Sequence, residues 1–166
     1  GFKPDVDVWA IDVYPIDWIN LPNSGNHANI AIEQVTEMRS YLNSITEYSD
    51  IPIWITEVGL HAGYPDYSYV GNNIEPQGLF DWPSVSEYLQ ILVDWLRDNA
   101  DDYNIGKWFA YVTYSDHTNE GGYMGIRFFD EPEYGATLNC LGEQYRAASL
   151  GLPDKKCDSA GNSIYR

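Results

Sequence analysis

The stretch from Ile51 to Gly59 constrains the fold most, because it is an apolar run that ends on a single carboxylate. An apolar run of this length suits one parallel strand covered on both faces. Glu57 closes the run, and Gly59 allows the backbone to turn directly afterwards. The C-terminal end of a parallel strand is where α/β sheets bind ligands, so Glu57 is a candidate functional residue. The alternative is that Glu57 begins a solvated loop, as most charged side chains do.

The remaining apolar patterns predict an alternation of strands and helices around this stretch. Besides residues 51–59, apolar runs predict strands at residues 6–15 and 105–114. Helical spacing predicts helices at residues 30–48, 83–100 and 136–150. The order strand, helix, strand, helix, strand, helix predicts right-handed βαβ units with a parallel sheet, an α/β fold. The helices would cover only one side of this sheet, so the other side needs a covering of its own.

Local signals place the predicted helix ends and faces. Asn29 is positioned to cap the first helix. The segment from Ser84 to Glu87 has the form of a capping box for the second helix, and Gly151 suits the C-terminal cap of the third. Arg39 is assigned to the solvated face of the first helix, opposite its apolar stripe.

The charge and length exclude several classes of function. The 166 residues fit one domain, and the formal net charge is −16, from 25 acidic and 9 basic residues. Such a charge repels nucleic acid and anionic membranes, so neither is expected as a partner. No apolar run approaches the roughly 20 residues that span a bilayer. The 14 tyrosines and 6 tryptophans suit surfaces that bind amphipathic rings such as sugars, although packing explains many of them.

The two cysteines, Cys140 and Cys157, allow either a disulfide or two unrelated thiols. A bridge would tie the C-terminal tail to the third predicted helix and would favour an extracellular, secreted protein. The tail, residues 153–166, is polar and is assigned no structure of its own. Residues 1–152 are therefore assigned to the predicted α/β domain.

Three segments together resemble a known family. The segment Trp54 to Gly59 (WITEVG) resembles the seventh-strand motif of the retaining (β/α)8-barrel glycoside hydrolases. The segment Asp12 to Pro15 (DVYP) is similar to the end of that family's sixth strand, and Trp108 to Tyr114 (WFAYVTY) is similar to its eighth. The resemblance covers about residues 5–151, with one βα unit between successive motifs.

The resemblance implies a partial TIM (β/α)8 barrel. Strands one to five of the family have no counterpart here, and neither does its acid/base Glu, usually preceded by Asn at the end of the fourth strand. The chain therefore looks like the C-terminal half of such a barrel. Its partners would be an oligo- or polysaccharide and either the remaining half of the barrel or a second copy of the chain.

By the same resemblance, Glu57 is the nucleophile that attacks the anomeric carbon, and Tyr14 is placed to hydrogen-bond its charged form. Asp12 shares a strand face with Tyr14, and it and Asp116 are the carboxylates that can stand in for the missing acid/base. The further candidates for substrate binding lie at strand ends and in the long connection after Gly59: His61, Trp82, Trp108, Tyr114 and Asp116. No cofactor and no metal are expected, since the rival metal set of Glu57, His61, Asp116 and His117 matches no metal-binding motif.

Two other interpretations stay open. A non-catalytic carbohydrate-binding or structural module would keep the rim of the sheet and lack the acid/base. A small self-contained α/β domain with an unrelated role would expose no large apolar sheet face. A nucleotide-binding doubly wound fold is disfavoured, because no glycine-rich phosphate loop follows the first predicted strand.

Overall fold

The computed structural model describes residues 4–15, 28–59, 81–111, 128 and 137–165. Within these ranges the chain alternates strands with helices and ends in a hairpin. The elements are β1 (Trp9–Val13), α1 (Ala28–Asn43), the 3-10 helix η1 (Thr46–Tyr48), β2 (Ile53–Val58), α2 (Trp82–Asn99), β3 (Ile105–Ala110), α3 (Cys140–Leu150), β4 (Lys155–Cys157) and β5 (Ser163–Tyr165).

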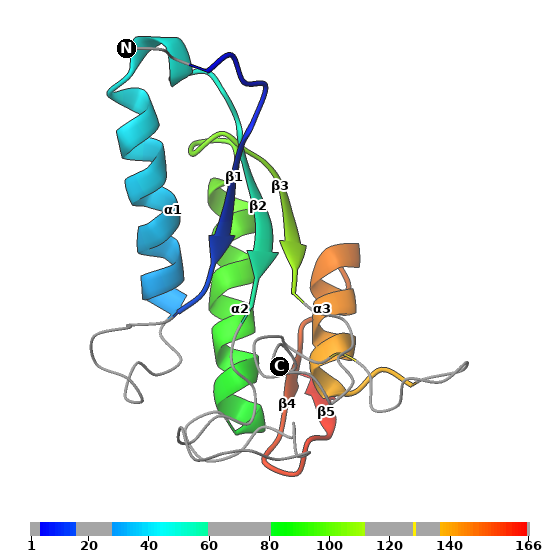
Figure 1. Cartoon of the computed structure of the whole chain (residues 1–166). Coiled ribbons are helices and arrows are strands. Elements are labelled where there is room, and N and C mark those ends of the chain that lie inside the picture. The colour runs from blue at the N-terminus through cyan, green and yellow to red at the C-terminus, as the bar shows by residue number, and fades with distance from the viewer. Residues whose placement is uncertain (1–3, 16–27, 60–80, 112–127, 129–136, 166) are drawn as a thin grey trace.

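The first three strands form one parallel sheet in the order β1-β2-β3. Figure 1 shows their arrows pointing the same way, with α2 behind the sheet, α1 beside β1 and α3 beside β3. A parallel pair needs a crossover connection, and α1 and α2 lie in those connections. The predicted α/β class with a parallel sheet is confirmed, whereas closure into a barrel is a matter of proposal.

The core lies between the sheet and its helices. β1 contributes Val13 and β2 contributes Ile53, Ile55 and Val58, all at most 1% exposed. The helices bury apolar side chains against them: Ala31, Val35 and Leu42 from α1, Val85, Tyr88, Leu89, Leu92, Val93 and Leu96 from α2, and Leu141 from α3. The predicted apolar stripes of α1 and α2 are therefore the faces that pack on the sheet.

The opposite side of the sheet, here called the open face, is not covered by any described helix. It carries the alternate strand residues Ala10, Asp12, Trp54, Thr56, Lys107 and Phe109. The Lys107 ammonium lies over the Trp54 ring, 4.6 Å from its centroid, and Phe109 is 47% exposed. The strands were expected to be covered on both faces, but the described residues cover only one.

Two of the predicted helix N-caps are wrong. The carboxylate of Asp81 caps α2 by accepting a hydrogen bond from the Ser84 backbone N–H at 2.9 Å, so Ser84 lies inside the helix. Asp81 lies three residues before Ser84, and aspartate is as good an N-cap residue as serine. The capping-box pattern of Ser84 and Glu87 therefore indicated the wrong residue. Asn29 also lies inside its helix, because α1 begins at Ala28. Gly151 does form the left-handed cap of α3, with a φ of 63°.

Arg39 is not on a solvated face, as was predicted from its charge. It is 4% exposed, and its guanidinium donates to the backbone carbonyls of Tyr48, Ser49 and Ile51 at 2.9 to 3.2 Å. These carbonyls belong to the connection between α1 and β2, which no ladder pairs. A planar guanidinium with five N–H donors suits a bend that presents several carbonyls.

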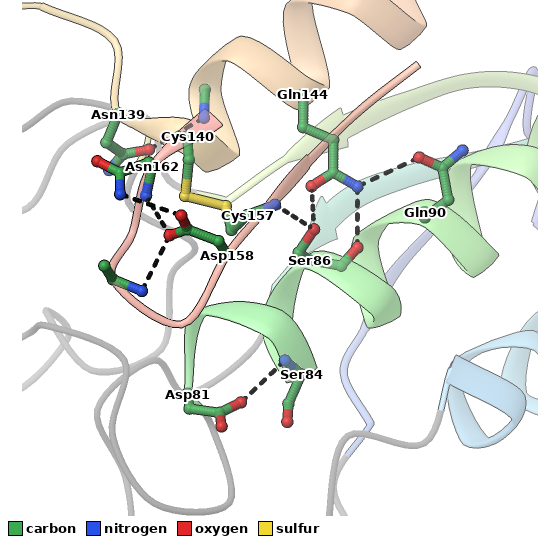
Figure 2. The surroundings of a disulfide bond; sticks show 12 residues. Asp81, Ser84, Ser86, Gln90, Asn139, Cys140, Gln144, Cys157, Asp158 and Asn162 are labelled. Atoms are coloured by element: carbon green, nitrogen blue, oxygen red, sulfur yellow. Dashed lines mark hydrogen bonds between the residues drawn. A yellow bond between two sulfur atoms is a disulfide. The ribbon is translucent and has the colours of Figure 1, made fainter. Parts of the chain in front are cut away.

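The C-terminal tail is structured, although the sequence indicated no element there. Lys155–Cys157 and Ser163–Tyr165 form an antiparallel hairpin, and Cys157 is bonded to Cys140 at the start of α3 (Figure 2). Two strands of this length cannot stand alone in water, so packing and the disulfide hold them. We call the group Ser86, Gln90, Cys140, Gln144 and Cys157 the stapled corner.

Candidate functional site

A β-bulge sets the direction of Glu57. Ile11 pairs with Ile55, but the next residue, Asp12, pairs with Glu57 and skips Thr56. Without the extra residue, strict alternation would put Glu57 on the same side as the buried Ile55. The bulge shifts the phase, so that Glu57 shares the open face with Asp12 and Val58 returns to the core.

Glu57 receives a hydrogen bond from the phenol of Tyr14. The distance from Tyr14 Oη to Glu57 Oε2 is 2.6 Å, and both residues are half-buried. Burial, and then the hydrogen bond to Glu57, raise the pKa of the Tyr14 phenol well above its usual range. The phenol therefore stays protonated at neutral pH and keeps donating to the carboxylate.

A second tyrosine, Tyr111, lies just beyond the end of β3, on the other side of β2 from Tyr14. The Tyr111 ring meets the Tyr14 ring edge to face, with centroids 6.4 Å apart. Its backbone N–H donates to the carbonyl of Val58 at 2.8 Å, so Tyr111 continues the pairing just beyond β3. The two rings thus come from the strands on either side of the one that carries Glu57. We call the group Asp12, Tyr14, Thr56, Glu57 and Tyr111 the sheet mouth.

Asp12 is held beside Glu57 by Thr56, the extra residue of the β-bulge. The Thr56 hydroxyl lies 2.8 Å from Asp12 Oδ1 and 3.2 Å from the carbonyl oxygen of Ile11, both acceptors. Asp12 and Thr56 are both exposed. The predicted proximity of Asp12, Tyr14 and Glu57 is therefore present in the structure, at the C-terminal ends of β1 and β2.

The backbone around the sheet mouth is fixed from the helix side. The Gly59 N–H donates to the carbonyl of Val13 at 3.3 Å. The Gly59 carbonyl accepts from the buried Tyr88 hydroxyl of α2 at 3.2 Å. Tyr14 is held by Gln34 of α1, which bonds both its N–H and its carbonyl. The sheet mouth is therefore supported by both helices that flank β2.

Two predicted substrate-binding residues lie elsewhere. Trp108 pairs with Ile55 and packs edge to face on Tyr145 of α3, with ring centroids 5.7 Å apart, so it faces the helices. Trp82 begins α2 and packs against the hairpin turn, where a Cβ on Gly161 would come within 2.9 Å of its indole. The structure does not bring either side chain to Glu57, and we leave both out of the candidate site. The predicted residues His61, Tyr114 and Asp116 lie outside the described residues.

A shallow groove lies between β1 and α1. Its volume is about 420 Å³, and it is lined by Ile11, Asp12, Gln34, Glu37, Met38 and Tyr41. A second hollow of about 340 Å³ lies between α2 and β4, lined by Pro83, Ser86, Glu87, Gln90, Ile91, Lys156 and Cys157. Asp12 and Gln34 therefore connect the first groove to the sheet mouth.

The described residues contain no group of three or more His, Cys, Asp or Glu side chains that could hold a metal ion. They also contain no helix with the length and apolarity to cross a bilayer. Of the rival metal set, Glu57 is among the described residues, and His61, Asp116 and His117 lie outside them.

Sequence reasoning missed three residues that shape this site: Gln34, Thr56 and Tyr111. Tyr111 carried a usable signal, since it follows Phe109 by two residues on a predicted strand and so shares its face. Thr56 is part of the WITEVG motif, but the alternation of buried and exposed residues along a strand does not show where a β-bulge lies. Gln34 carried no signal, because its contact depends on how α1 packs beside β1.

Comparisons of the chain with protein-family models, with curated protein sequences and with solved structures find no match. The function must therefore be argued from the geometry of the sheet mouth. That geometry offers a half-buried carboxylate with a phenol donor at the C-terminal end of a parallel sheet, flanked by an aromatic ring.

Proposed function

We propose that the chain is part of a retaining glycoside hydrolase that acts on β-linked glycans, with Glu57 as the nucleophile. The observation that carries the proposal is the 2.6 Å hydrogen bond from the Tyr14 phenol to Glu57 on the open face of the sheet. A nucleophilic carboxylate must be ionised and aimed at the anomeric carbon. A neutral phenol donor favours the ionised form and fixes its orientation.

Retention also needs a second carboxyl group, about 5 Å from the nucleophile, to protonate the leaving oxygen. Asp12 is the neighbouring carboxylate among the described residues, but it accepts from Thr56 and is exposed. We therefore place the acid/base outside the described residues. The rings of Tyr14 and Tyr111 offer apolar surface to a sugar, and their hydroxyls offer polar contacts.

We further propose that the open face becomes the inner face of a (β/α)8 barrel. Parallel strands with all their helices on one side have the arrangement of part of such a barrel. The exposed Phe109 and Lys107 and the half-buried Trp54 would then be covered by the other strands. The remaining half of the barrel, or a second copy of the chain, would supply them.

The test uses an inactivator that needs no acid catalyst. A 2-deoxy-2-fluoro-β-glycoside with a dinitrophenyl leaving group glycosylates the nucleophile without protonation of the leaving oxygen. The complete protein, with the remaining half of the barrel present, is incubated with the gluco-, manno-, galacto- and xylo-configured compounds, and its peptides are mapped by mass spectrometry. We expect one sugar to be retained on the peptide that contains Glu57.

Two variants make this result specific. Glu57→Gln keeps the size and polarity of the side chain and should abolish labelling, by more than about a thousandfold. Asp12→Asn removes the neighbouring charge and should still be labelled. Labelling at any other residue, or none with the whole panel, would contradict the proposal.

A non-catalytic carbohydrate-binding module is the second candidate, and the aromatic pair Tyr14 and Tyr111 favours it. Stacking on such rings binds sugars without any chemistry. Isothermal titration with β-linked oligosaccharides separates the two functions. Binding that survives Glu57→Gln, together with no covalent label on the unaltered protein, supports the module and not the hydrolase.

We also propose that the protein works in an oxidising, extracellular setting. The disulfide between Cys140 and Cys157 supports this, since such bonds persist mainly in secreted proteins. Alkylation of the natural protein without a reductant should modify neither cysteine. Complete modification of both would contradict the secreted location.

A further inference from the structure

The side chain of Gln34 in α1 forms two hydrogen bonds with the backbone of Tyr14, and we call this pair of bonds the grip. The Tyr14 N–H donates to Gln34 Oε1 at 3.2 Å, and Gln34 Nε2 donates to the Tyr14 carbonyl at 2.8 Å. Tyr14 lies just beyond β1, which ends at Val13, and just before Pro15. Its backbone is therefore fixed by a helix side chain at the point where the strand ladder stops.

We propose that Gln34 is a positioning residue for the nucleophile, and this rests on the function proposed above. One primary amide offers a donor and an acceptor in one plane, which matches the N–H and carbonyl of a single residue. Two such bonds fix the rotation of the Tyr14 backbone and hence the direction of its ring. The ring in turn holds its hydroxyl 2.6 Å from Glu57 Oε2.

The chemistry of the grip makes it testable by a single substitution. A carboxylate at this position can accept from the Tyr14 N–H but cannot donate to the carbonyl. A protonated carboxyl group can do both, so Gln34→Glu restores the grip only when it is protonated. A free glutamic acid titrates near pH 4.3.

The surroundings of Gln34 shift that titration in a known direction. Asp12 from β1 and Glu37 and Tyr41 from α1 line the same groove, and Tyr14 and Glu57 lie beyond them. The negative charges of Asp12 and Glu37 favour the protonated form of a carboxyl group placed in the same groove. The grip of Gln34→Glu should therefore return at a somewhat higher pH than that of free glutamic acid.

The first experiment follows the rate of labelling by the fluoro-glycoside that modifies Glu57. At pH 7, Gln34→Glu and Gln34→Ala should both be slower than the unaltered protein by up to about tenfold, because a small displacement of the nucleophile is costly. As the pH falls below about 5, the ratio of variant to unaltered rate should rise for Gln34→Glu and stay flat for Gln34→Ala. Glu37→Gln, which removes a charge one turn away in the same groove, should label at the normal rate at every pH.

A second readout does not depend on labelling. 3-Fluorotyrosine is placed at position 14 alone, and its fluorine resonance reports the ionisation of the phenol. Gln34→Ala should lower the pKa of this phenol toward its ordinary value, as Glu57→Gln should, and Glu37→Gln should leave it unchanged. Urea unfolding confirms that each variant is folded.

The two readouts separate the two proposals. If the unaltered protein takes no label but the phenol titration responds to Gln34→Ala, then the hydrolase assignment fails while Gln34 still positions Tyr14. If labelling occurs at Glu57 but Gln34→Ala changes neither the rate nor the titration, the positioning role is overturned. A Gln34→Glu variant that stays slow at low pH, with the phenol titration still shifted, would also overturn the two-bond grip as its cause.

Discussion

The sheet mouth and the stapled corner are both polar, but they handle their polar groups differently. At the stapled corner, Ser86 is 2% and Gln144 1% exposed, so these groups are closed to solvent. At the sheet mouth, Tyr14 and Glu57 are only half-buried and Asp12 is exposed. A closed polar group can stabilise the fold but cannot meet a ligand, whereas a half-exposed one can do so.

Within the stapled corner the buried groups satisfy one another (Figure 2). The Ser86 hydroxyl donates to Gln144 Oε1 at 2.6 Å and accepts from the Cys157 N–H at 3.0 Å. Gln144 Nε2 donates to the Ser86 carbonyl at 2.9 Å and to Gln90 Oε1 at 3.3 Å. A buried network with its partners in place contributes to stability and specifies the packing. Substitutions here should therefore change stability, and substitutions at the sheet mouth should change chemistry.

Removing the disulfide should give the greatest loss of stability. Cys140 and Cys157 are 17 residues apart, and a closed loop of that size is worth about 3 kcal/mol through the unfolded chain. Urea unfolding of Cys140→Ser with Cys157→Ser should show a loss of that order, while the labelling rate of the folded fraction is unchanged. A slower label in the folded fraction would mean that the two regions are coupled.

Ser86→Ala should cost less, about 2 kcal/mol, because it leaves the Cys157 N–H and a Gln144 oxygen without their buried partner. The matched control is Ser40→Ala, at an exposed position of α1, which should stay within about 0.5 kcal/mol. Chemical unfolding measures both. Equal effects for the two serines would show that the corner network contributes little.

Local sequence patterns predicted the framework of the fold and missed the features that depend on the strand register. Apolar runs and helical stripes predicted the parallel sheet, because burial of these side chains is what forms it. They also predicted that Glu57 lies at a strand end on the same side as Asp12, whereas the nearness of Tyr14 was implied by the family resemblance. Alternation would have turned Glu57 toward the helices, and only the extra residue at Thr56, visible in the register, places it on the open face.

The remaining errors arose where long-range contacts outweigh local propensity. Arg39 is charged, yet it is buried, because its guanidinium donates to three backbone carbonyls between α1 and β2. The hairpin strands are too short to be predicted, and they exist because Cys157 is bonded to Cys140 and its N–H to Ser86. Gln34 is an ordinary polar helix residue until α1 is placed beside the end of β1. Each of these depends on a partner distant in sequence, which periodicity does not report.

Tyr14→Phe should affect the chemistry more than the fold. It removes only the phenol that donates to Glu57, so stability should change by about 1 kcal/mol or less. The rate of labelling at Glu57 should fall about tenfold, since a hydrogen bond to a charged group is among the stronger ones. Parallel measurement of unfolding and labelling checks both. A large loss of stability with a normal labelling rate would assign Tyr14 to the fold.

The smallest expected effect is a difference in how stability falls at alkaline pH. The pKa of the Tyr14 phenol is raised in the folded chain, first by burial and then by Glu57, while an unfolded tyrosine ionises near pH 10. Below pH 10 neither state releases this proton, so its contribution is fully present. Above pH 10 the unfolded chain releases it and the folded chain does not, so stability falls as the pH rises. Between pH 10 and 11 the unaltered protein should therefore lose stability faster than Tyr14→Phe.

Tyr88 provides the control for this slope, because burial alone raises the pKa of its phenol. Glu57→Gln removes one cause of the Tyr14 shift and should flatten the slope that Tyr14 contributes, without changing the part contributed by Tyr88. Urea unfolding of the unaltered protein, Tyr14→Phe, Tyr88→Phe and each tyrosine variant combined with Glu57→Gln measures these slopes. If Glu57→Gln flattens the slope equally with Tyr14 present and absent, the phenol and the carboxylate are not coupled. The sheet mouth would then be no more than a second polar surface, and the contrast with the stapled corner would lose its meaning.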